Sequence, residues 1–197
     1  MKILIACEFS GIVRDAFIAR GHDAVSCDLL PTERPGPHIQ GDVLEHLEDG
    51  WDMMIAHPPC TYLAVAGLHY SKKNPQRMEK TREAIRFFLR LYNAPIERVA
   101  VENPVGIVNT EFRKPNQIID PFMFGTPERK KTCLWLRGLP LLLPTHNAMP
   151  APKHTIIRKS GPKKGQAYNY YWRQGKSAHD RSRTFSCIAN AMADQWG

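Results

Sequence analysis

Apolar segments alternate with helix-like segments over roughly the first 140 residues, and this alternation constrains the fold more than any other feature. The apolar segments are KILIACEF (2–9), DAVSCDLL (23–30), WDMMIAH (51–57), RVAVENP (98–104) and TCLWLRGLPLLLP (132–144). The segments at 12–21 and 74–95 instead repeat apolar side chains every three or four residues, as helices do. Strands alternating with helices form βαβ units. The sequence therefore predicts an α/β, Rossmann-like fold with a mostly parallel sheet and helices on both faces.

Positive charge gathers in one segment near the end of the chain. Residues 151–183 hold nine Lys or Arg against one acid, Asp180, which accounts for the formal net charge of +8. Aromatic residues lie among these charges: Tyr168, Tyr170, Tyr171 and Trp172. Basic side chains bind phosphates and aromatic rings stack on bases, so this segment predicts a nucleic-acid partner. The alternative is a solvated basic loop.

The change in composition near residue 150 sets the expected organisation. Residues 31–42 are rich in Pro and Gly and are predicted to form a loop. Residues 184–197 predict a helix with an apolar face at Ile188, Ala191 and Met192. We expect one main domain, made of residues 1–143 together with 184–197, and a small basic segment at 144–183.

Composition also limits the class of protein. Hydrophobic residues make up 43% and charged residues 23% of the 197 positions, as in ordinary globular proteins. The five cysteines, at positions 7, 27, 60, 133 and 187, are odd in number, widely spaced and without a CxxC pair. We therefore expect neither a disulfide framework nor a metal site. No apolar run has the length of a signal or a membrane span, so we expect a reduced, cytoplasmic protein without a membrane partner.

Polar residues follow the predicted strands where each strand ends. They occur at 8–11, at Asp28, at 57–60 and at 102–104. Ligands of parallel α/β sheets bind beyond the carboxyl ends of the strands. The sequence therefore predicts a binding site at this edge of the sheet.

Two of these strand ends carry groups with reactive chemistry. Two prolines hold Cys60 in a rigid loop, as a nucleophilic thiol requires. The alternative is an incidental cysteine after a strand-ending Pro-Pro. Glu102 and Asn103 end the neighbouring strand, where a carboxyl group can hydrogen-bond a ring nitrogen or transfer a proton. The alternative for this pair is capping of a turn.

The first strand and the second offer a nucleotide-type site. Gly11 permits a tight turn into a helix whose N-terminus would face a ligand. Asp28 ends the second strand, where an acid often meets ribose hydroxyls. An ordinary strand–helix turn and a solvated turn acid are the alternatives.

Taken together and in order, these segments resemble the DNA cytosine-5 methyltransferases, most closely the short versions found in phages and prophages. FSGIV (9–13) is similar to the family's first motif, HPPCTYLAVAG (57–67) to its Pro-Cys loop, and VENPVG (101–106) to its Glu-Asn-Val motif. FGTPERKKTCLWL (124–136) occupies the place of the Gln-x-Arg-x-Arg strand, and IANAMA (188–193) is similar to the final motif.

The resemblance implies an S-adenosylmethionine-dependent methyltransferase fold and methyl transfer to carbon 5 of cytosine in DNA. The catalytic residues implied are Cys60, Glu102, Asn103 and Lys130. The cofactor-binding residues implied are Phe9, Ser10, Gly11, Asp28, Asp42, Pro58 and Asn190. Residues expected to contact nucleic acid are Arg158, Lys159, Lys163, Lys164, Tyr170, Trp172 and Arg173.

The implied mechanism begins with the thiolate of Cys60 adding to carbon 6, which makes carbon 5 nucleophilic. Glu102 binds or protonates nitrogen 3. The reacting cytosine has to be flipped out of a duplex or be single-stranded. With a phage source, the location implied is the host cytoplasm.

Four features depart from the family pattern. Val13 replaces the second glycine of the first motif, and His57 replaces the usual residue before Pro-Pro. Lys130 and Thr132 replace the two arginines of the Gln-x-Arg-x-Arg strand, and Glu128 replaces its glutamine. For His57, tuning of the thiolate and capping of the strand stay open, with capping favoured. The fourth feature is length, because a recognition domain has to fit between about residues 144 and 183.

So small a segment predicts short or relaxed sequence specificity. Two other functions stay open. One is a DNA-binding or protective phage protein without activity, suggested by Val13 and Thr132. The other is methylation of a free pyrimidine nucleotide. The sequence fixes neither the target motif nor the oligomeric state.

Overall fold

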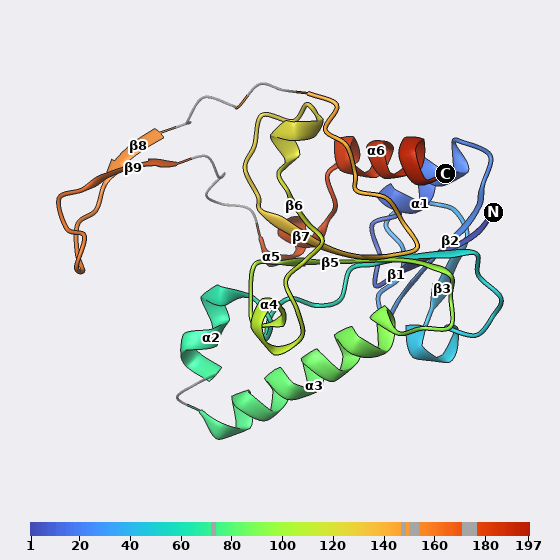
Figure 1. Ribbon diagram of the computed structural model, residues 1–197, viewed down its shortest axis with the longest axis horizontal. Helices are drawn as coiled ribbons and strands as arrows, with labels where there is room; N and C mark the ends of the chain where they lie inside the picture. The colour runs from blue at the N-terminus through green and yellow to red at the C-terminus, as the bar shows by residue number, and fades with distance from the viewer. Residues whose placement is uncertain (72–73, 147–148, 150–153, 171–176) are drawn as a thin grey trace.

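A seven-stranded sheet forms the centre of the computed structural model, which describes residues 1–71, 74–146, 149, 154–170 and 177–197 (Figure 1). The strands are β1 (Lys2–Ala6), β2 (Asp23–Asp28), β3 (His38–Gln40), β4 (Met53–Ala56), β5 (Arg98–Pro104), β6 (Gln117–Ile119) and β7 (Thr132–Arg137). Their order is β3-β2-β1-β4-β5-β7-β6. The first five pair in parallel, whereas β7 pairs antiparallel with β5 and β6. The predicted mostly parallel sheet is confirmed.

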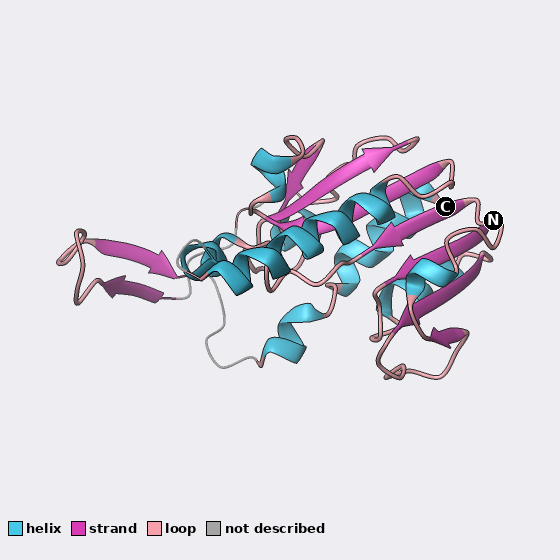
Figure 2. Ribbon diagram, turned by 90° about the horizontal axis from the view of Figure 1, so that it is seen from below, coloured by secondary structure: helices cyan, strands magenta, loops and turns pink. Residues whose placement is uncertain are grey.

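Helices cover both faces of this sheet (Figures 1 and 2). Helices α1 (Ile12–Ile18) and α6 (Ser186–Trp196) pack against each other on one face, and α2 (Val65–Ser71) and α3 (Pro75–Tyr92) lie on the other. The remaining helices are short: α4 (Val108–Glu111), α5 (Ala178–Ser182), and the 3-10 turns η1 (Val43–Glu45) and η2 (Pro121–Phe124). This arrangement confirms the predicted α/β, Rossmann-like fold.

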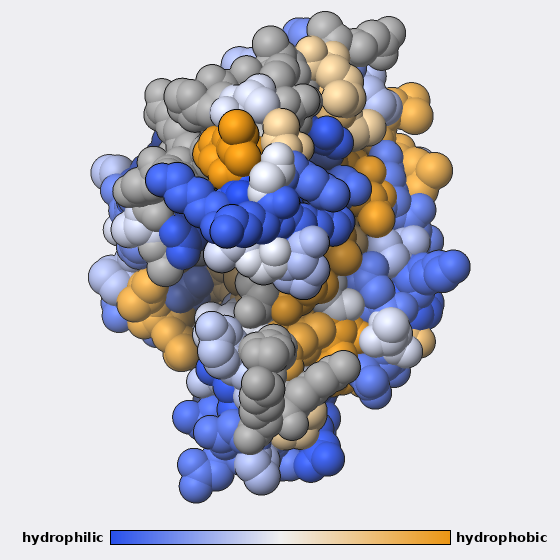
Figure 3. Space-filling view, turned by 90° about the vertical axis from the view of Figure 1, so that its left-hand side faces the viewer, coloured by the Kyte–Doolittle hydropathy of each residue, from blue (hydrophilic) through white to orange (hydrophobic). Residues whose placement is uncertain are grey.

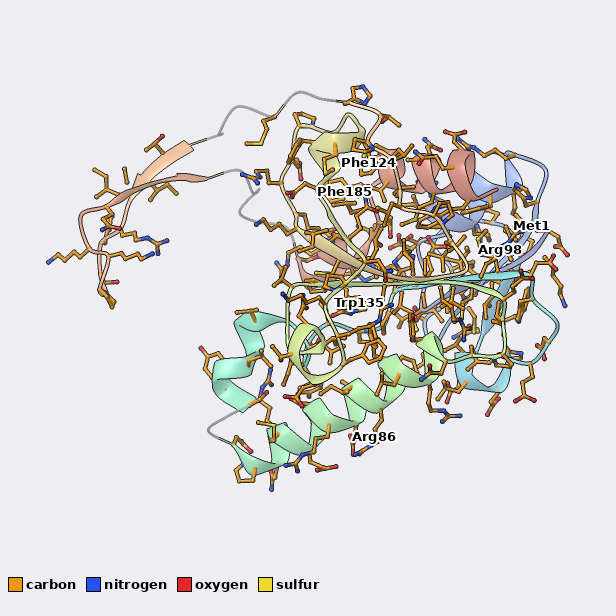
Figure 4. The ribbon with its side chains drawn as sticks, viewed as in Figure 1. Met1, Arg86, Arg98, Phe124, Trp135 and Phe185 are labelled. Carbon is orange, nitrogen blue, oxygen red and sulfur yellow. The ribbon has the colours of Figure 1, made fainter. Side chains whose placement is uncertain are left out.

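The apolar strands separate two hydrophobic cores. In β1, Ile3 and Ile5 belong to the core under α1 and α6, whereas Leu4 and Ala6 belong to the core under α3. Alternate side chains of a strand point to opposite faces, so a strand buried on both faces is apolar throughout. Figure 4 shows Trp135 between the sheet and α3, with Phe124 and Phe185 on the opposite side of the sheet.

Two segments contain regular structure that the sequence did not indicate: the predicted loop 31–42 and the basic segment. In the predicted loop 31–42, strand β3 pairs in parallel with β2. The ring of His38 lies 2.8 Å from the Ser26 hydroxyl, and the buried Arg14 donates to the carbonyl of Pro37, so side chains hold this short edge strand in place. In the basic segment, β8 (His154–Ile157) and β9 (Ala167–Tyr170) form an antiparallel hairpin, which stands apart from the sheet (Figures 1 and 2).

The end of the basic segment returns to the main domain. The guanidinium of Arg183 and the ring of His179 both bind the carboxylate of Glu33, at 2.6 and 2.7 Å. The ring of His179 also packs on Phe9, with 4.6 Å between centroids. Helix α5 therefore lies on the loop after β2. The domain boundary predicted at residue 183 stays a prediction. Within the described part of the chain, no helix combines the length and the apolar character needed to cross a membrane.

Candidate active site

The loop that carries Cys60 and the segment after Glu102 are joined by their backbones. The amide of Val65 donates to the carbonyl of Val105 at 3.2 Å, and the amide of Ile107 donates to the carbonyl of Leu63 at 2.9 Å. Gly106 lies at this crossing, where an added Cβ would stand 1.9 Å from the Leu63 oxygen. Only glycine permits so close an approach. The two motifs, more than 40 positions apart in sequence, thus form one unit.

Side chains join the same two segments closer to the sheet. The ring Nδ1 of His57 lies 2.9 Å from Oε2 of Glu102. Asn103, which is buried, donates from Nδ2 to the carbonyl of Pro58 at 2.8 Å. The register of the sheet explains this placement, because Ala56 pairs with Val101 and the next residues of both strands are then neighbours. His57 therefore contacts Glu102 in addition to ending its strand.

Glu102 is held in its ionised form. Burial is the largest single influence and opposes ionisation, but the hydrogen bond from His57 and the nearby positive charges together outweigh it and lower the pKa of the carboxyl group below its ordinary value. The charges of His57 and Lys130 act in the same direction. Glu102, His57 and Lys130 line one small cavity of about 10 Å³ with Thr132 and residues of α6.

Cys60 lies within the electrostatic reach of this carboxylate. The residue is exposed, yet partial shielding of its sulfur and the charge of Glu102 raise the pKa of the thiol. Lys130 and Arg181 act against this rise. The ammonium of Lys130 also donates to the carbonyl of Arg181 at 2.8 Å, which ties α5 to the same region. Glu102 and Lys130 thus share a cavity, and Cys60 lies within range of their charges and of Arg181, a residue that the sequence did not indicate.

A second cavity, of about 240 Å³, opens at the carboxyl ends of β1 and β2. It contains two of the predicted cofactor residues, Asp28 and Asp42, together with Pro59 from the Cys60 loop. Its other walls are mostly apolar: Cys7, Cys27, Leu29, Gly41, Val43, Leu44 and Phe87. The sequence did not mark three of these residues, Cys7, Leu44 and Phe87, as lining a cavity, because half-buried apolar residues are common after strands and on helices.

The two carboxylates of this cavity are positioned by turns. Asp28 accepts from the amide of Leu30 at 2.9 Å, and Asp42 accepts from the amide of Leu44 at 3.0 Å. Each uses Oδ1 for this bond, so in the described structure Oδ2 remains able to accept from a ligand. Burial and the acids raise the pKa of Cys27 to about 11 and keep its thiol neutral. The cavity thus combines apolar walls with two acceptors.

Gly11 makes the predicted tight turn into a helix, and a carboxylate caps the start of that helix. The buried carboxylate of Glu8 accepts from the amides of Val13 and Arg14, at 2.7 and 3.2 Å, and so covers the N-terminus of α1. Ser10 donates to the same carboxylate at 3.0 Å. Gly11 has φ +70°, a backbone conformation that favours glycine. The fully buried side chain of Arg14 packs behind this turn, where an added Cβ at Gly11 would collide with it.

Several predicted residues do not line the two cavities described above. Phe9, Ser10 and Gly11 are absent from the lining of the 240 Å³ cavity, and Glu8 caps the helix terminus next to them, so their cofactor role stays a prediction. Asn190 is exposed on α6, which packs on the face of the sheet opposite α3. Pro58 is buried and serves as the acceptor for Asn103.

The predicted nucleic-acid residues lie mainly on the hairpin. Arg158, Lys159, Lys163 and Lys164 are exposed in the connection between β8 and β9, and Tyr170 ends β9. Trp172 and Arg173 lie outside the described residues. Figure 3 shows the side towards which the hairpin projects, where a hydrophilic band crosses the middle and hydrophobic residues lie below it.

Comparisons with known proteins concern the fold alone. No protein-family model matches the sequence, and no curated protein matches it. A solved structure described as a DNA modification methyltransferase encoded within a prophage of E. coli is similar with a TM-score of 0.47 and 11% identity, over 91% of this chain and 62% of that one. The methyltransferase EhMeth of Entamoeba histolytica is similar with a TM-score of 0.49 and 14% identity, over 76% of this chain and 57% of that one. The chain thus spans less than two thirds of the length of either structure.

Proposed function

We propose that this protein transfers a methyl group from S-adenosylmethionine to carbon 5 of cytosine in DNA, through a covalent adduct with Cys60. One observation carries the proposal. The loop that contributes Pro59 to the cavity with two acids also presents Cys60 in the field of Glu102 and Lys130. A donor site and a nucleophile thereby share one short loop.

The 240 Å³ cavity suits the adenosine part of the donor. Apolar walls accommodate a flat base, and the Oδ2 atoms of Asp28 and Asp42 can accept from ribose hydroxyls or an exocyclic amine. When bound, S-adenosylmethionine supplies an electrophilic methyl group. Val13 does not oppose this fit, because its side chain is fully buried in the core beneath α1 and α6.

The residues of this chain would act on the pyrimidine. The Cys60 thiolate adds to carbon 6, forming a carbon–sulfur bond and moving the electron pair of the 5,6 double bond into the ring. Glu102 holds nitrogen 3 and the exocyclic amine, and the neighbouring Lys130 balances the local charge. After methylation, loss of the carbon 5 proton to a base lets the sulfur leave, which regenerates Cys60.

DNA is the favoured substrate because of the hairpin. Its connection carries four exposed basic residues, Arg158, Lys159, Lys163 and Lys164, which suit phosphates. The cytosine would reach Cys60 flipped out or single-stranded. With so small a recognition element, we expect short or relaxed sequence specificity.

Mass spectrometry of nucleosides tests the proposal. DNA incubated with the protein and labelled S-adenosylmethionine should yield labelled 5-methyl-2′-deoxycytidine, and dCMP should be a poor acceptor. Cys60→Ser should lower the rate by at least about 10³-fold, as loss of a nucleophile does. Cys187→Ser is the matched control, since Cys187 is half-buried on α6 and lines neither cavity.

The outcomes separate the alternatives. Full activity of Cys60→Ser contradicts the covalent scheme. No methylation and no calorimetric binding of the donor at millimolar concentration, with DNA binding retained, indicates the non-enzymatic DNA-binding function. Efficient methylation of dCMP indicates the free-nucleotide function.

A further inference from the structure

The ring of His57 has a contact that the proposed mechanism does not yet use. Its side chain is 7% exposed, and Nδ1 lies 2.9 Å from Oε2 of Glu102. Its Nε2 is buried and has no hydrogen-bond partner within the described structure. The 10 Å³ cavity that His57 shares with Glu102 is about the size of one water molecule.

The proton positions follow from this contact. Glu102 is favoured as a carboxylate, which can only accept, so Nδ1 of His57 is the donor. Nε2 is then an acceptor in the neutral ring and a second N–H in the charged ring. When the ring is charged, the His57–Glu102 pair therefore carries one exchangeable proton in addition to the proton in its hydrogen bond.

The proposed addition needs such a proton. When sulfur adds to carbon 6, negative charge develops on the ring and is relieved by protonation of nitrogen 3. An ionised Glu102 lacks the proton to give. His57 is the nearest group in contact with Glu102 that can supply one.

We propose, resting on the function proposed above, that His57 is a positioning residue that orients Glu102 and supplies, through it, the proton for nitrogen 3 of the pyrimidine. The proton on Nδ1 of the charged His57 ring passes to the Glu102 carboxylate, which passes it on to nitrogen 3, so the imidazolium becomes neutral and Glu102 is ionised again. When Cys60 leaves, the nitrogen 3 proton returns by the same route, so His57 and Glu102 end the cycle as they began it, and the carbon 5 proton leaves to a separate base.

The charged surroundings of His57 are limited. Glu102 faces it from β5, and Lys130 faces the shared cavity from the segment before β7. Cys60 follows on its own loop, where the charge of Arg181 on α5 acts on its thiol. Helix α6 contributes only apolar side chains to this cavity, Ile188 and Met192. Any alternative proton source in this cavity is therefore Lys130 or solvent.

The first test uses His57→Asn, because an asparagine amide places its N–H near the position of Nδ1 but cannot carry the extra proton. We expect kcat for DNA methylation to fall about 10²-fold, as for loss of general acid catalysis, with KM for DNA changed less than about twofold. The pH dependence of kcat should differ between the wild type and the variant, because asparagine removes the titratable group from this position.

The control is His46→Asn. His46 forms a ring–carboxylate contact of the same length, 2.9 Å, with Asp49, but lines neither cavity. This variant should keep the wild-type kcat and pH profile. A His57→Asn variant that also keeps both would overturn the proposal.

The second test does not depend on activity. Nitrogen NMR of the His57 ring should show the neutral ring protonated on Nδ1 in the wild type and shifted towards Nε2 protonation in Glu102→Gln. An Nε2-protonated neutral ring in the wild type, or the same tautomer in both proteins, overturns the proposal. A wild-type protein that transfers no methyl group would refute the proposed function instead, and the NMR result would still decide the state of this pair.

Discussion

Replacing Gly106 by alanine should separate the two segments that form the active site. The added Cβ would stand 1.9 Å from the Leu63 oxygen and 2.8 Å from its carbonyl carbon, and contacts below 3.0 Å essentially do not occur. Both atoms belong to the backbone, so no side chain can rotate away. The segments must move apart by about 1 Å or more, which lengthens the bonds Ile107–Leu63 and Val65–Val105.

The cost can be worked from these contacts. Two backbone hydrogen bonds contribute about 1 kcal/mol each to the free energy of unfolding. Overpacking typically costs about 1–3 kcal/mol. The total is roughly 3–5 kcal/mol, or a lowering of Tm by roughly 6–20 °C for a chain of this size.

Urea denaturation followed by circular dichroism measures this change. Gly41→Ala is the matched control for stability, because its Cβ would meet no atom within 4 Å and its φ is not in the left-handed region. The control should stay within about 1 kcal/mol of the wild type. A Gly106→Ala variant within about 0.5 kcal/mol of the wild type would refute the close packing of the two segments.

Two further predictions concern the electrostatics of the site. Because the charge of Glu102 raises the pKa of the Cys60 thiol, Glu102→Gln should lower this pKa and speed alkylation of Cys60 by iodoacetamide severalfold near pH 7. Lys130→Met should slow the same alkylation. Equal alkylation rates in the wild type and both variants would contradict the electrostatic contact. Asp28→Asn should weaken calorimetric binding of S-adenosylmethionine by about tenfold, as loss of a hydrogen bond from a charged acceptor does, while Asp49→Asn should leave it unchanged.

The sequence was sufficient to predict the sheet edge at which the site lies. Apolar runs mark the strands, and parallel strands end at one edge, so the segments after β2, β4 and β5 had to meet there. Asp28, which ends β2, and Pro59, which follows β4, line one cavity for this reason. The short edge strand β3 was missed because three residues in a segment rich in Pro and Gly give no periodic signal.

Side-chain partners could not be predicted in the same way. The contact between His57 and Glu102 depends on the register of β4 against β5, and a shift of one residue would place their side chains on opposite faces. The capping of α1 by Glu8 depends on the left-handed turn at Gly11, which brings the amides of Val13 and Arg14 to the carboxylate. The spacing of residues in the sequence predicts neither the register of neighbouring strands nor the geometry of a turn.

The two main departures from the methyltransferase motifs differ in consequence because their side chains point to different places. Val13 directs its side chain into the core, so its backbone amide remains in the turn and the cavity walls do not change. His57 directs its ring to Glu102, in the cavity where chemistry is proposed, and there it changes which atoms can carry a proton. For these two substitutions the direction of the side chain therefore decides the effect on the proposed chemistry, and of the two it is His57 that points into the cavity where this chemistry is proposed.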